Sequence, residues 1–381
     1  MASIHMRTIR WETKDGEERT GRRYQARYRD RSGQEHARLF KLKRDAQRWL
    51  NEQTAGIVTG QWADPRAGKQ TLKTYAELWR TRQVHADTTE LQVESILRNH
   101  VFPAIGGMRL DSISPADVQA LVKSWSVTAA PSTVENRYLI LAIVLRAAVR
   151  DRVIPASPCV DIKLPRIAPK SALVPITTET VLALWEAMAD RYKVFVTVAA
   201  GTGMRRGELL GLTHDRVSHD FGTIRVDRQM SRRATAEQVI FVEPKTEAST
   251  RTIQVADVVL DAITKHVERF GAHQTGLVLT SEIGTPLRTS TLHRAWTIAT
   301  HKVGIEATPH DLRHYFASMQ IAGGTSIKKL QALLGHKSAM ETWDTYGHLM
   351  GDEDDRSRSV IQGALAVLGK SADSTRTVEP H

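Results

Sequence analysis

The chain has 381 residues, of which 41% are apolar and 25% charged, and this predicts a soluble globular protein of two or three domains. Its 53 lysines and arginines outnumber its 42 acidic residues, so the formal net charge is +11 and a polyanionic partner such as nucleic acid is expected. No apolar run approaches about 18 residues and the N-terminus lacks the apolar core of a signal peptide, so we expect a cytoplasmic protein with no membrane partner. Cys159 is the single cysteine, which excludes an internal disulfide and argues against a cysteine-based metal site.

The N-terminal segment is strongly basic, with eleven lysines and arginines against three acidic residues between positions 19 and 48. Alternation over residues 23–29 predicts a strand, and after a turn residues 35–40 and 44–54 predict a return strand and a helix. We therefore predict a small β-rich domain with one helix over residues 1–64. Its charge has two interpretations, an ordinary solvated face or a sheet laid into a DNA groove, because a two-stranded ribbon fits the major groove.

An all-α domain is predicted next, over residues 71–165, after a glycine- and proline-containing linker at 56–70. Apolar residues recur at helical spacing in this domain and indicate four or five helices. Ser114 followed by Pro115 is typical of a capped helix start. The basic stretch at 163–170 then predicts a stiff, extended linker.

The C-terminal segment, residues 174–381, mixes helical and strand patterns and predicts a mainly α domain with a small antiparallel sheet. We expect helices from about residue 308 onward and over 179–200, 205–212 and 257–269, with strands over 222–229, 239–244 and 251–256. The tail from Ser371 is polar and is predicted to be disordered. The predicted fold class is therefore multidomain, with a β-rich, an all-α and a mixed, mainly α domain in that order.

An arginine at a helix start is the first candidate for chemistry. Gly201-Thr-Gly203 predicts the end of one helix, and Arg205 lies at the start of the next, where free backbone N–H groups favour anions. Glu208 lies three residues further on the same face and can hold the guanidinium in place. An ordinary surface ion pair explains these two residues equally well.

A second group of candidates lies nearer the C-terminus. His310 and Arg313 have i, i+3 spacing on a predicted helix, so an imidazole and a guanidinium face the same side. Tyr346 is one of seven tyrosines and, taken alone, is most simply a half-buried packing residue. Lys245 lies between two predicted strands, where it can reach into a site or remain solvated.

Taken together, these residues resemble the tyrosine recombinases, or phage integrases. The resemblance rests on the order Thr-Gly-Met-Arg205-x-Gly-Glu208, a hairpin Lys245, His310-x-x-Arg313, Leu-Gly-His336 and Tyr346-x-His348. It is strongest over residues 174–350. It implies a site-specific DNA recombinase that cleaves and rejoins strands, integrating and excising mobile DNA, and needs neither nucleotide nor metal.

The resemblance also implies how the phosphate is attacked. Arg205 and Arg313 would bind the non-bridging oxygens of the scissile phosphate, because a guanidinium is bidentate and permanently charged. Tyr346 would attack phosphorus, giving a 3′-phosphotyrosyl link and a free 5′-hydroxyl. Glu208 would orient its neighbours.

Three further residues would move or share protons in the family's reaction. Lys245 would protonate the leaving oxygen, and His310 would assist the tyrosine as acid and base. His336 would donate a hydrogen bond to the phosphate as charge develops. His314 and His348 are expected to be structural.

The basic N-terminal segment favours an integrase of a phage or prophage, since large phage integrases carry an extra domain for arm-type sites, apart from the core sites where strands are cut. The candidate DNA contacts there are Arg19, Arg22, Arg23, Arg27, Arg29, Arg31, Lys41 and Lys43. Such integrases act as tetramers on double-stranded DNA, and a DNA-bending accessory protein and an excisionase are expected as further partners. The apolar stretch 360–368, after the acidic run 352–355, is either a docking helix for a neighbouring subunit or a closing helix on its own domain.

Four other classes remain open. They are a chromosome-dimer-resolving recombinase, a non-catalytic DNA-binding regulator, a type IB topoisomerase, and a metal-dependent nuclease built on His310, His314 and His336. The sequence has no phosphate-binding Gly-rich loop and no obvious carboxylate cluster for magnesium.

Overall fold

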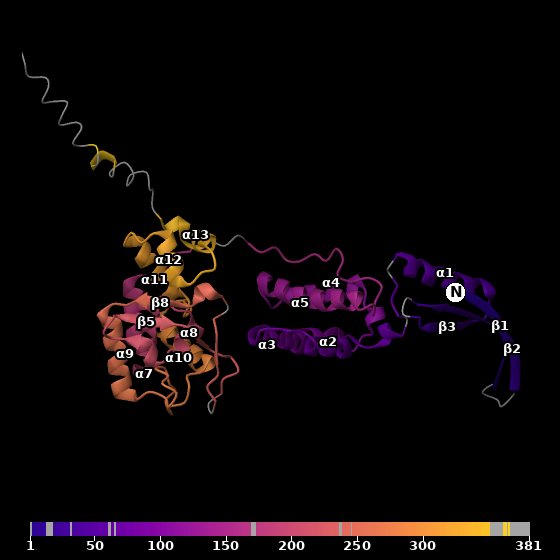
Figure 1. The fold of residues 1–381 in the computed structure, drawn as a ribbon, viewed down its shortest axis with the longest axis horizontal. Coiled ribbons are helices and arrows are strands. Elements are labelled where there is room, and N and C mark those ends of the chain that lie inside the picture. The colour runs from indigo at the N-terminus through magenta and orange to yellow at the C-terminus, as the bar shows by residue number, and fades with distance from the viewer. Residues whose placement is uncertain are drawn as a thin grey trace, which may run out of the picture. The chain divides into compact units, whose positions relative to one another are not determined.

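The computed structural model describes residues 2–12, 18–30, 33–59, 62–64, 66–168, 173–235, 238–244, 246–350, 361–363 and 365. Contacts divide the chain into two units, Met1–Pro169 and Lys170–His381, and each is described by itself (Figure 1). The boundary falls at the end of the predicted basic linker. The further division of the first unit at residues 64 and 71 stays a prediction. Among the residues described, no helix combines the length and apolar character needed to span a bilayer.

An antiparallel sheet and one helix form the N-terminal part of the first unit. The strands β1 (Ser3–Glu12), β2 (Glu18–Arg29) and β3 (Glu35–Phe40) lie in the order β1-β2-β3, and α1 (Lys43–Thr59) follows. The predicted hairpin and helix are confirmed. The helix runs further than expected because it continues through Gly56 into the predicted linker.

The sequence pattern does not predict β1. Its residues are mostly exposed and show little apolar alternation, so burial provides no signal there. The strand is instead held by backbone pairing with β2, from Ser3 opposite Arg27 to Glu12 opposite Glu18.

A small aromatic core fixes α1 on this sheet. The Tyr28 hydroxyl accepts a hydrogen bond from Trp62 Nε1 at 2.8 Å, and the Tyr28 ring stacks on His36 at 5.1 Å between centroids. His36 in turn pairs with Asp30 at 2.8 Å. The buried apolar residues of this cluster are Ala26, Tyr28, Ala46, Trp49 and Leu50.

Helices make up the rest of the first unit, as predicted. They are η1 (Ala67–Lys69), α2 (Leu72–Thr81), α3 (Asp87–Ile96), η2 (Leu97–Gly106), η3 (Leu110–Ser112), α4 (Pro115–Ser126) and α5 (Pro131–Arg150). The predicted cap is confirmed, since the Ser114 side chain accepts from the Asp117 backbone N–H and the Asp117 carboxylate accepts from that of Ser114. These helices surround one apolar core that includes Leu72, Leu97, Leu141 and Leu145.

Pro103 lies inside a helix and does not end it. The chain continues from α3 into η2, a π-helix that contains Pro103 and ends at Gly106. A proline ring clashes with the carbonyl four residues earlier in an α-helix, and the wider π turn relieves that clash.

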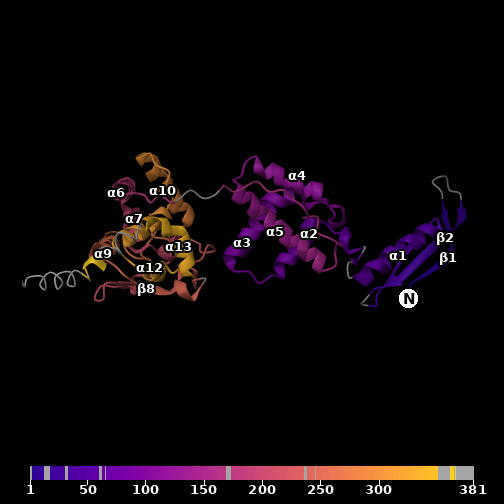
Figure 2. The same ribbon diagram turned by 90° about the horizontal axis from the view of Figure 1, so that it is seen from above.

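The described residues of the second unit form helices and two small sheets (Figure 2). Its helices are α6 (Thr178–Ala187), α7 (Asp190–Thr202), α8 (Arg206–Leu210), η4 (His214–Arg216), η5 (Glu247–Ser249), α9 (Asp257–Phe270), α10 (Thr289–Val303), α11 (Asp311–Ala322), α12 (Ile327–Leu334), α13 (Ala339–Tyr346) and η6 (Gly347–Leu349). One antiparallel sheet has the order β4-β5-β8, with strands Val217–Ser218, Thr223–Val226 and Arg251–Gln254, and the other pairs β6 (Gln229–Met230) with β7 (Phe241–Val242).

The predicted mixed class is therefore correct for the second unit, but several boundaries differ. The helix expected over 179–200 is divided into α6 and α7 at Met188 and Ala189, which are not helical. The strands are shorter than expected, and α10 is not predicted. The candidate docking stretch 360–368 and the acidic run 352–355 lie almost wholly outside the described residues.

Helix α7 is central to the second unit. It contacts α6, α8, α9 and α11, and its buried side chains include Phe195, Val196 and Val198. Helix α12 contacts α11, α13 and β8. The ends of α7 and α12 are thereby brought to α11 and β8, where the predicted site residues lie.

Candidate active site

A tight turn places Arg205 at the start of α8. Helix α7 ends at Thr202, and Gly203 has a positive φ of 63°. A Cβ at Gly203 would lie 2.4 Å from Phe316 Cδ1, so both the backbone conformation and the space require glycine. The predicted helix break at Gly203 is confirmed, and it leaves Arg205 at the first turn of α8.

Glu208 is a buried carboxylate shared by two arginines. It is 2% exposed, and its Oε1 accepts from Arg205 Nη1 at 3.0 Å. Arg251, on β8, donates to both oxygens, at 3.2 Å to Oε1 and 2.9 Å to Oε2. Burial alone would raise the pKa of Glu208, but the hydrogen bonds and charges of Arg251 and Arg205 outweigh it and lower that pKa.

Three consecutive carbonyls at the end of α12 bind three arginines. Leu333 O accepts from Arg251 Nε at 2.7 Å, Leu334 O from Arg313 Nη2 at 2.8 Å, and Gly335 O from Arg205 Nη2 at 2.8 Å. The last carbonyls of a helix have no partner within the helix and carry its partial negative charge. The end of α12 therefore sets the relative positions of the three guanidinium groups.

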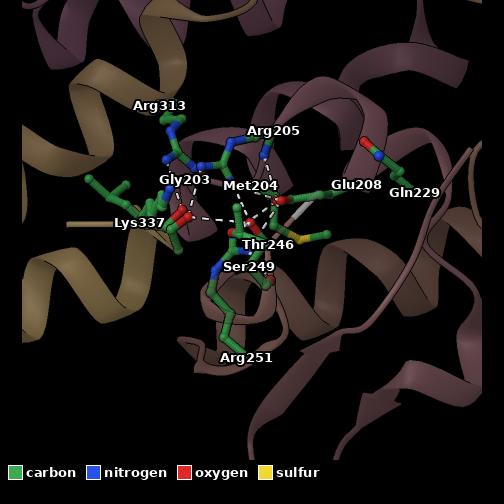
Figure 3. A network of polar contacts seen from close by, with 12 residues as sticks. Gly203, Met204, Arg205, Glu208, Gln229, Thr246, Ser249, Arg251, Arg313 and Lys337 are labelled. Carbon is green, nitrogen blue, oxygen red and sulfur yellow. Dashed lines mark hydrogen bonds and ion pairs between the residues drawn. The ribbon is translucent and has the colours of Figure 1, made fainter. Parts of the chain in front are cut away.

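Arg313 is the second predicted phosphate ligand, and it lies next to Arg205. It is 2% exposed, and its Nη1 donates to Gly203 O at 2.7 Å. Burial, followed by the charge of Arg205, lowers the pKa of Arg313 to about 10, so it is still cationic at neutral pH. Figure 3 shows the Arg205 and Arg313 side chains at one end of the network, with Glu208 and Arg251 further along it.

The two positive charges of Arg205 and Arg313 lie close together, and this favours the binding of an anion. The side chain of Arg205 is 35% exposed, so a ligand can reach it from solvent. Each guanidinium donates to a neutral backbone carbonyl. Among the described residues, the carboxylate of Glu208 pairs with Arg205 and Arg251. A phosphate is the kind of anion that arginine forks bind bidentately.

Tyr346, the last residue of α13, is buried beside the arginines. It is 1% exposed, and its hydroxyl lies 2.9 Å from His314 Nδ1. Burial raises the pKa of Tyr346 to about 12, against the charge of Arg313, which lowers it.

His336 packs against the same tyrosine. Its ring lies parallel to that of Tyr346 with centroids 6.5 Å apart, and its Nδ1 is 2.9 Å from Thr342 Oγ1. Burial, then the charges of Arg313 and Arg205, lowers the pKa of His336 to about 3. The imidazole is therefore neutral at physiological pH.

His310 lies just before α11, one helical turn from His314. The two rings meet edge to face with centroids 4.6 Å apart. His310 is exposed, but partial desolvation, followed by the charges of His314 and Arg313, lowers its pKa to about 4. A histidine pair of this kind stays neutral at pH 7.

Two family models match the chain. The model described as "Phage integrase family" covers residues 175–352, and "Phage integrase, N-terminal SAM-like domain" covers residues 71–126. A protein named as the prophage phiRv2 integrase of Mycobacterium tuberculosis is 28% identical over 337 residues, which are 83% of this chain and 86% of that protein. The integrase of Mycobacterium phage D29 is 24% identical over 78% of this chain and 82% of its own length.

The chain belongs to the phage integrase family. It is a site-specific integrase, an enzyme of the tyrosine recombinase type.

Solved structures of integrases have the same fold. The Tn1549 transposon integrase in complex with a circular intermediate DNA matches 77% of this chain and 99% of its own with a TM-score of 0.63 and 21% identity. A lambda integrase dimer bound to a COC' core site matches 91% of this chain and 95% of its own, with a TM-score of 0.57 and 18% identity.

Most of the residues predicted for this integrase meet at one place. Arg205, Glu208, Arg313, His336 and Tyr346 are joined there by the contacts given above, and His310 reaches the group through the ring of His314. Lys245 lies outside the described residues, so its position stays a prediction.

The N-terminal candidates lie elsewhere, in the first unit. Arg19, Arg22 and Arg29 on β2 are exposed, whereas Arg23 and Arg27 are half-buried. Lys41 and Lys43 are exposed just before and at the start of α1, and Arg31 lies outside the described residues.

Sequence reasoning missed two residues of this integrase's site. Arg251 was recognisable only as a basic residue at the start of a predicted strand, although a buried Glu208 calls for a cation. His314 is expected to be structural, yet it contacts the tyrosine hydroxyl. Its i+4 spacing from His310 was the available signal, since residues four apart lie on one helical face.

His348 lies apart from this cluster, with its Nε2 2.8 Å from Leu173 O. That contact is consistent with the structural role expected for it. Among the described residues, no group of three or more histidine, cysteine, aspartate or glutamate side chains is arranged to hold a metal ion.

Proposed function

We propose that this integrase cuts and rejoins double-stranded DNA with Tyr346 as nucleophile and with Arg205 and Arg313 bound to the scissile phosphate. The observation that carries the proposal is that Arg205 and Arg313 are hydrogen-bonded to adjacent carbonyls, those of Gly335 and Leu334, beside a buried tyrosine. Two cations held side by side repel each other unless an anion lies between them. A phosphodiester is that anion.

In the proposed reaction the phosphate stays esterified throughout, first to DNA and then to Tyr346. The Tyr346 oxygen forms a bond to phosphorus as the bond to the 5′ oxygen breaks, which yields a 3′-phosphotyrosyl link and a 5′-hydroxyl. The two arginines stabilise the charge that develops on the non-bridging oxygens, and neutral His336 adds a hydrogen bond. Lys245 protonates the leaving oxygen. A 5′-hydroxyl from another strand then attacks the phosphotyrosine and restores the backbone.

Tyr346 has to change position during this reaction. Because its side chain is 1% exposed, its hydroxyl is out of reach of DNA in the fold described above. We infer that DNA binding shifts α13 (Ala339–Tyr346) toward the phosphate held by Arg205 and Arg313. The raised pKa of the buried phenol keeps it protonated and unreactive until then.

The other parts of the chain have roles around this reaction in our proposal. Residues 1–64 bind arm-type sites through their exposed arginines and lysines, residues 71–165 bind the core site, and residues 174–381 carry out the chemistry. The match to a lambda integrase dimer bound to a core site, over 91% of this chain, supports the binding of a core site. A lambda integrase tetramer bound to a Holliday junction, with a TM-score of 0.55 over 87% of this chain, supports a tetramer on DNA. A DNA-bending protein and an excisionase in a bacterial host complete the system.

Trapping the covalent intermediate tests the proposal. The core sequence is first recovered by capturing protein–DNA adducts from a randomised pool of nicked duplexes. Wild-type protein should then form an adduct with the nicked core duplex, and Tyr346→Phe should form none while it still binds the duplex.

Tyr315→Phe is the matched control, because the Tyr315 hydroxyl contacts Thr178 outside the site. Its adduct yield should equal that of wild type. If Tyr346→Phe forms as much adduct as wild type, Tyr346 is not the nucleophile.

A further inference from the structure

Arg251 is a buried arginine of this site that takes no part in the proposed reaction. Its side chain is 6% exposed, whereas that of Arg205 is 35% exposed, so Arg251 is out of reach of a ligand that arrives from solvent. It lies on β8 and donates to the carbonyls of Leu333 and Ser249 and to both oxygens of Glu208. None of these partners lies on α13, the helix that has to shift when DNA binds.

Glu208 by itself would oppose the binding of a phosphate. Its Oε1 accepts from Arg205 Nη1 at 3.0 Å, and its Oε2 accepts from the backbone N–H of Arg205 at 2.8 Å. A buried carboxylate this close to a phosphate ligand offsets the charge of that ligand and repels the incoming anion, and both effects are strong where little water screens them. A second cation is therefore needed beside Glu208 if Arg205 is to bind a phosphate.

Arg251 is that second cation. It forms a two-point ion pair with Glu208, at 3.2 Å to Oε1 and 2.9 Å to Oε2. Burial raises the pKa of Glu208, and of the two residues that lower this pKa, Arg251 acts more strongly than Arg205. Together with Arg313, these side chains comprise three cations and one anion with a net charge of +2, which would fall to +1 without Arg251.

The same arginine ties this ion pair to the end of α12. Its Nε donates to Leu333 O at 2.7 Å, two residues before Gly335, whose carbonyl accepts from Arg205 Nη2 at 2.8 Å. Arg205 is thereby held between Glu208 and the α12 carbonyls, and Arg251 bonds to both of these supports.

We infer that Arg251 is a positioning residue that neutralises Glu208, so that this carboxylate orients Arg205 without competing with the scissile phosphate. Arg251 does not touch DNA in this role and acts through Glu208. The inference rests on the proposed function, because it takes Arg205 to be a ligand of the phosphate. Its consequence is that Glu208 becomes inhibitory when Arg251 is removed.

The test begins with Arg251→Met, which keeps an apolar stem and removes the guanidinium. Adduct formation on the nicked core duplex should slow by about 10–10²-fold, the effect of one uncompensated charge about 6–8 Å away at an effective dielectric constant of about 20. Combining this change with Glu208→Gln removes the uncompensated charge and should raise the rate again by about tenfold or more.

A duplex with a neutral methylphosphonate at the cleaved position separates charge from folding. Wild type should cleave the phosphate faster than the methylphosphonate, because Arg205 and Arg313 stabilise the negative charge of the phosphate. In Arg251→Met this preference should shrink, since the free carboxylate repels only the charged substrate, and Glu208→Gln in the same chain should restore it. A variant that is merely less folded loses rate on both substrates alike and keeps the preference.

Arg216→Met is the matched control. Arg216 is an arginine of the same unit that pairs with a carboxylate outside the site, that of Asp227, at 2.9 Å. The preference of this variant for the charged substrate should equal that of wild type.

The outcomes distinguish the inference from the proposed function. An unchanged preference in Arg251→Met, or a double variant that does not recover it, would overturn the role of Arg251 even while Tyr346→Phe forms no adduct. An adduct formed by Tyr346→Phe would instead overturn the proposed function.

The double variant also carries the test if Arg251→Met does not fold. It lacks both charges of the buried ion pair, so no buried charge is left by the loss of Arg251. Because it keeps Arg205 and Arg313 and has no carboxylate at Glu208, it should prefer the charged substrate as strongly as wild type. A lost preference in this variant would overturn the inference.

Discussion

Glu208 is the carboxylate around which the basic site is organised. It is 2% exposed and binds Arg205 and Arg251, so a neutral residue in its place would leave buried cationic charge without a partner. The sequence predicted that Arg205 binds the anion and that Glu208 orients the guanidinium of Arg205. The contacts extend that expectation, because the same carboxylate also orients Arg251.

We predict that Glu208→Gln destabilises the protein by about 3–5 kcal/mol at pH 7, as when one partner of a buried ion pair is removed. The folded-state pKa of Glu208 is lowered from 4.5, so its stabilising contribution is present above about pH 4.5 and is lost as pH falls through the lower, folded value. Urea unfolding of both proteins at pH 7, 5 and below 4 measures this. A difference between the proteins that disappears already at pH 5 would contradict it.

The charge state of His336 gives a second prediction at this scale. Because its pKa is lowered to about 3, the imidazole should stay neutral from pH 8 down to pH 5. The ring carbon signal of His336, assigned by comparison with His336→Gln in histidine-labelled protein, should not shift over that range. A midpoint near 6.5 would mean that the site is more hydrated than its burial implies.

At the scale of elements, the end of α12 determines the geometry of the site. Gly335 has a positive φ of 64°, and a Cβ there would lie 3.0 Å from Arg251 Nη1 and 3.1 Å from Ala248 O. The turn at Gly335 directs three successive carbonyls toward three arginines and places His336 directly after them.

We predict that Gly335→Ala lowers adduct formation far more than it lowers stability. Gly304 provides a matched control, since it ends α10 with a positive φ of 74° but has nothing within 4 Å of an added Cβ. Both variants pay a conformational cost of about 1–2 kcal/mol. Only Gly335→Ala should also displace the arginines, so equal activity in the two variants would show that the carbonyls do not position them.

Helix and strand positions were predictable where burial leaves a periodic pattern. The capped start of α4 at Ser114 and the hairpin of β2 and β3 follow directly from the residue order. By contrast, β1 is held by backbone pairing, and backbone hydrogen bonds leave little trace in side-chain pattern. The missed α10 and the division of the helix at Met188 likewise depend on packing in the second unit.

At the scale of the whole molecule, the net positive charge is concentrated in the first unit, residues 1–169, which has 28 basic and 18 acidic residues. Residues 1–64 contain 14 basic and 9 acidic residues and so account for +5 of the net charge of +11. If this segment binds arm-type DNA, its removal should reduce the number of phosphates neutralised.

We predict that removing residues 1–64 abolishes binding to arm-type duplexes and leaves weaker core binding and cleavage. The log–log dependence of arm-duplex affinity on salt should be steep for the full chain, with a slope of about −0.9 for each phosphate neutralised. Core-duplex titrations of the shortened protein serve as the control. Loss of core cleavage on truncation would place the domain boundary elsewhere.

The family and the reaction type followed from the sequence alone. Arg205, Glu208, His310, Arg313, His336 and Tyr346 were predicted as site residues because their order and spacing resemble those of the tyrosine recombinases. Chain order does not reveal distance across the fold. Arg205 and Gly335, which share a hydrogen bond, are 130 residues apart.

Only the tertiary structure showed which groups meet. It brought Arg251 to Glu208 and His314 to the Tyr346 hydroxyl, two contacts made between separate elements. Spacing along one helix can show that His310, Arg313 and His314 are near one another, but not which of them an approaching tyrosine will contact. That choice depends on how α13 packs beside α11, and packing is a property of the folded chain.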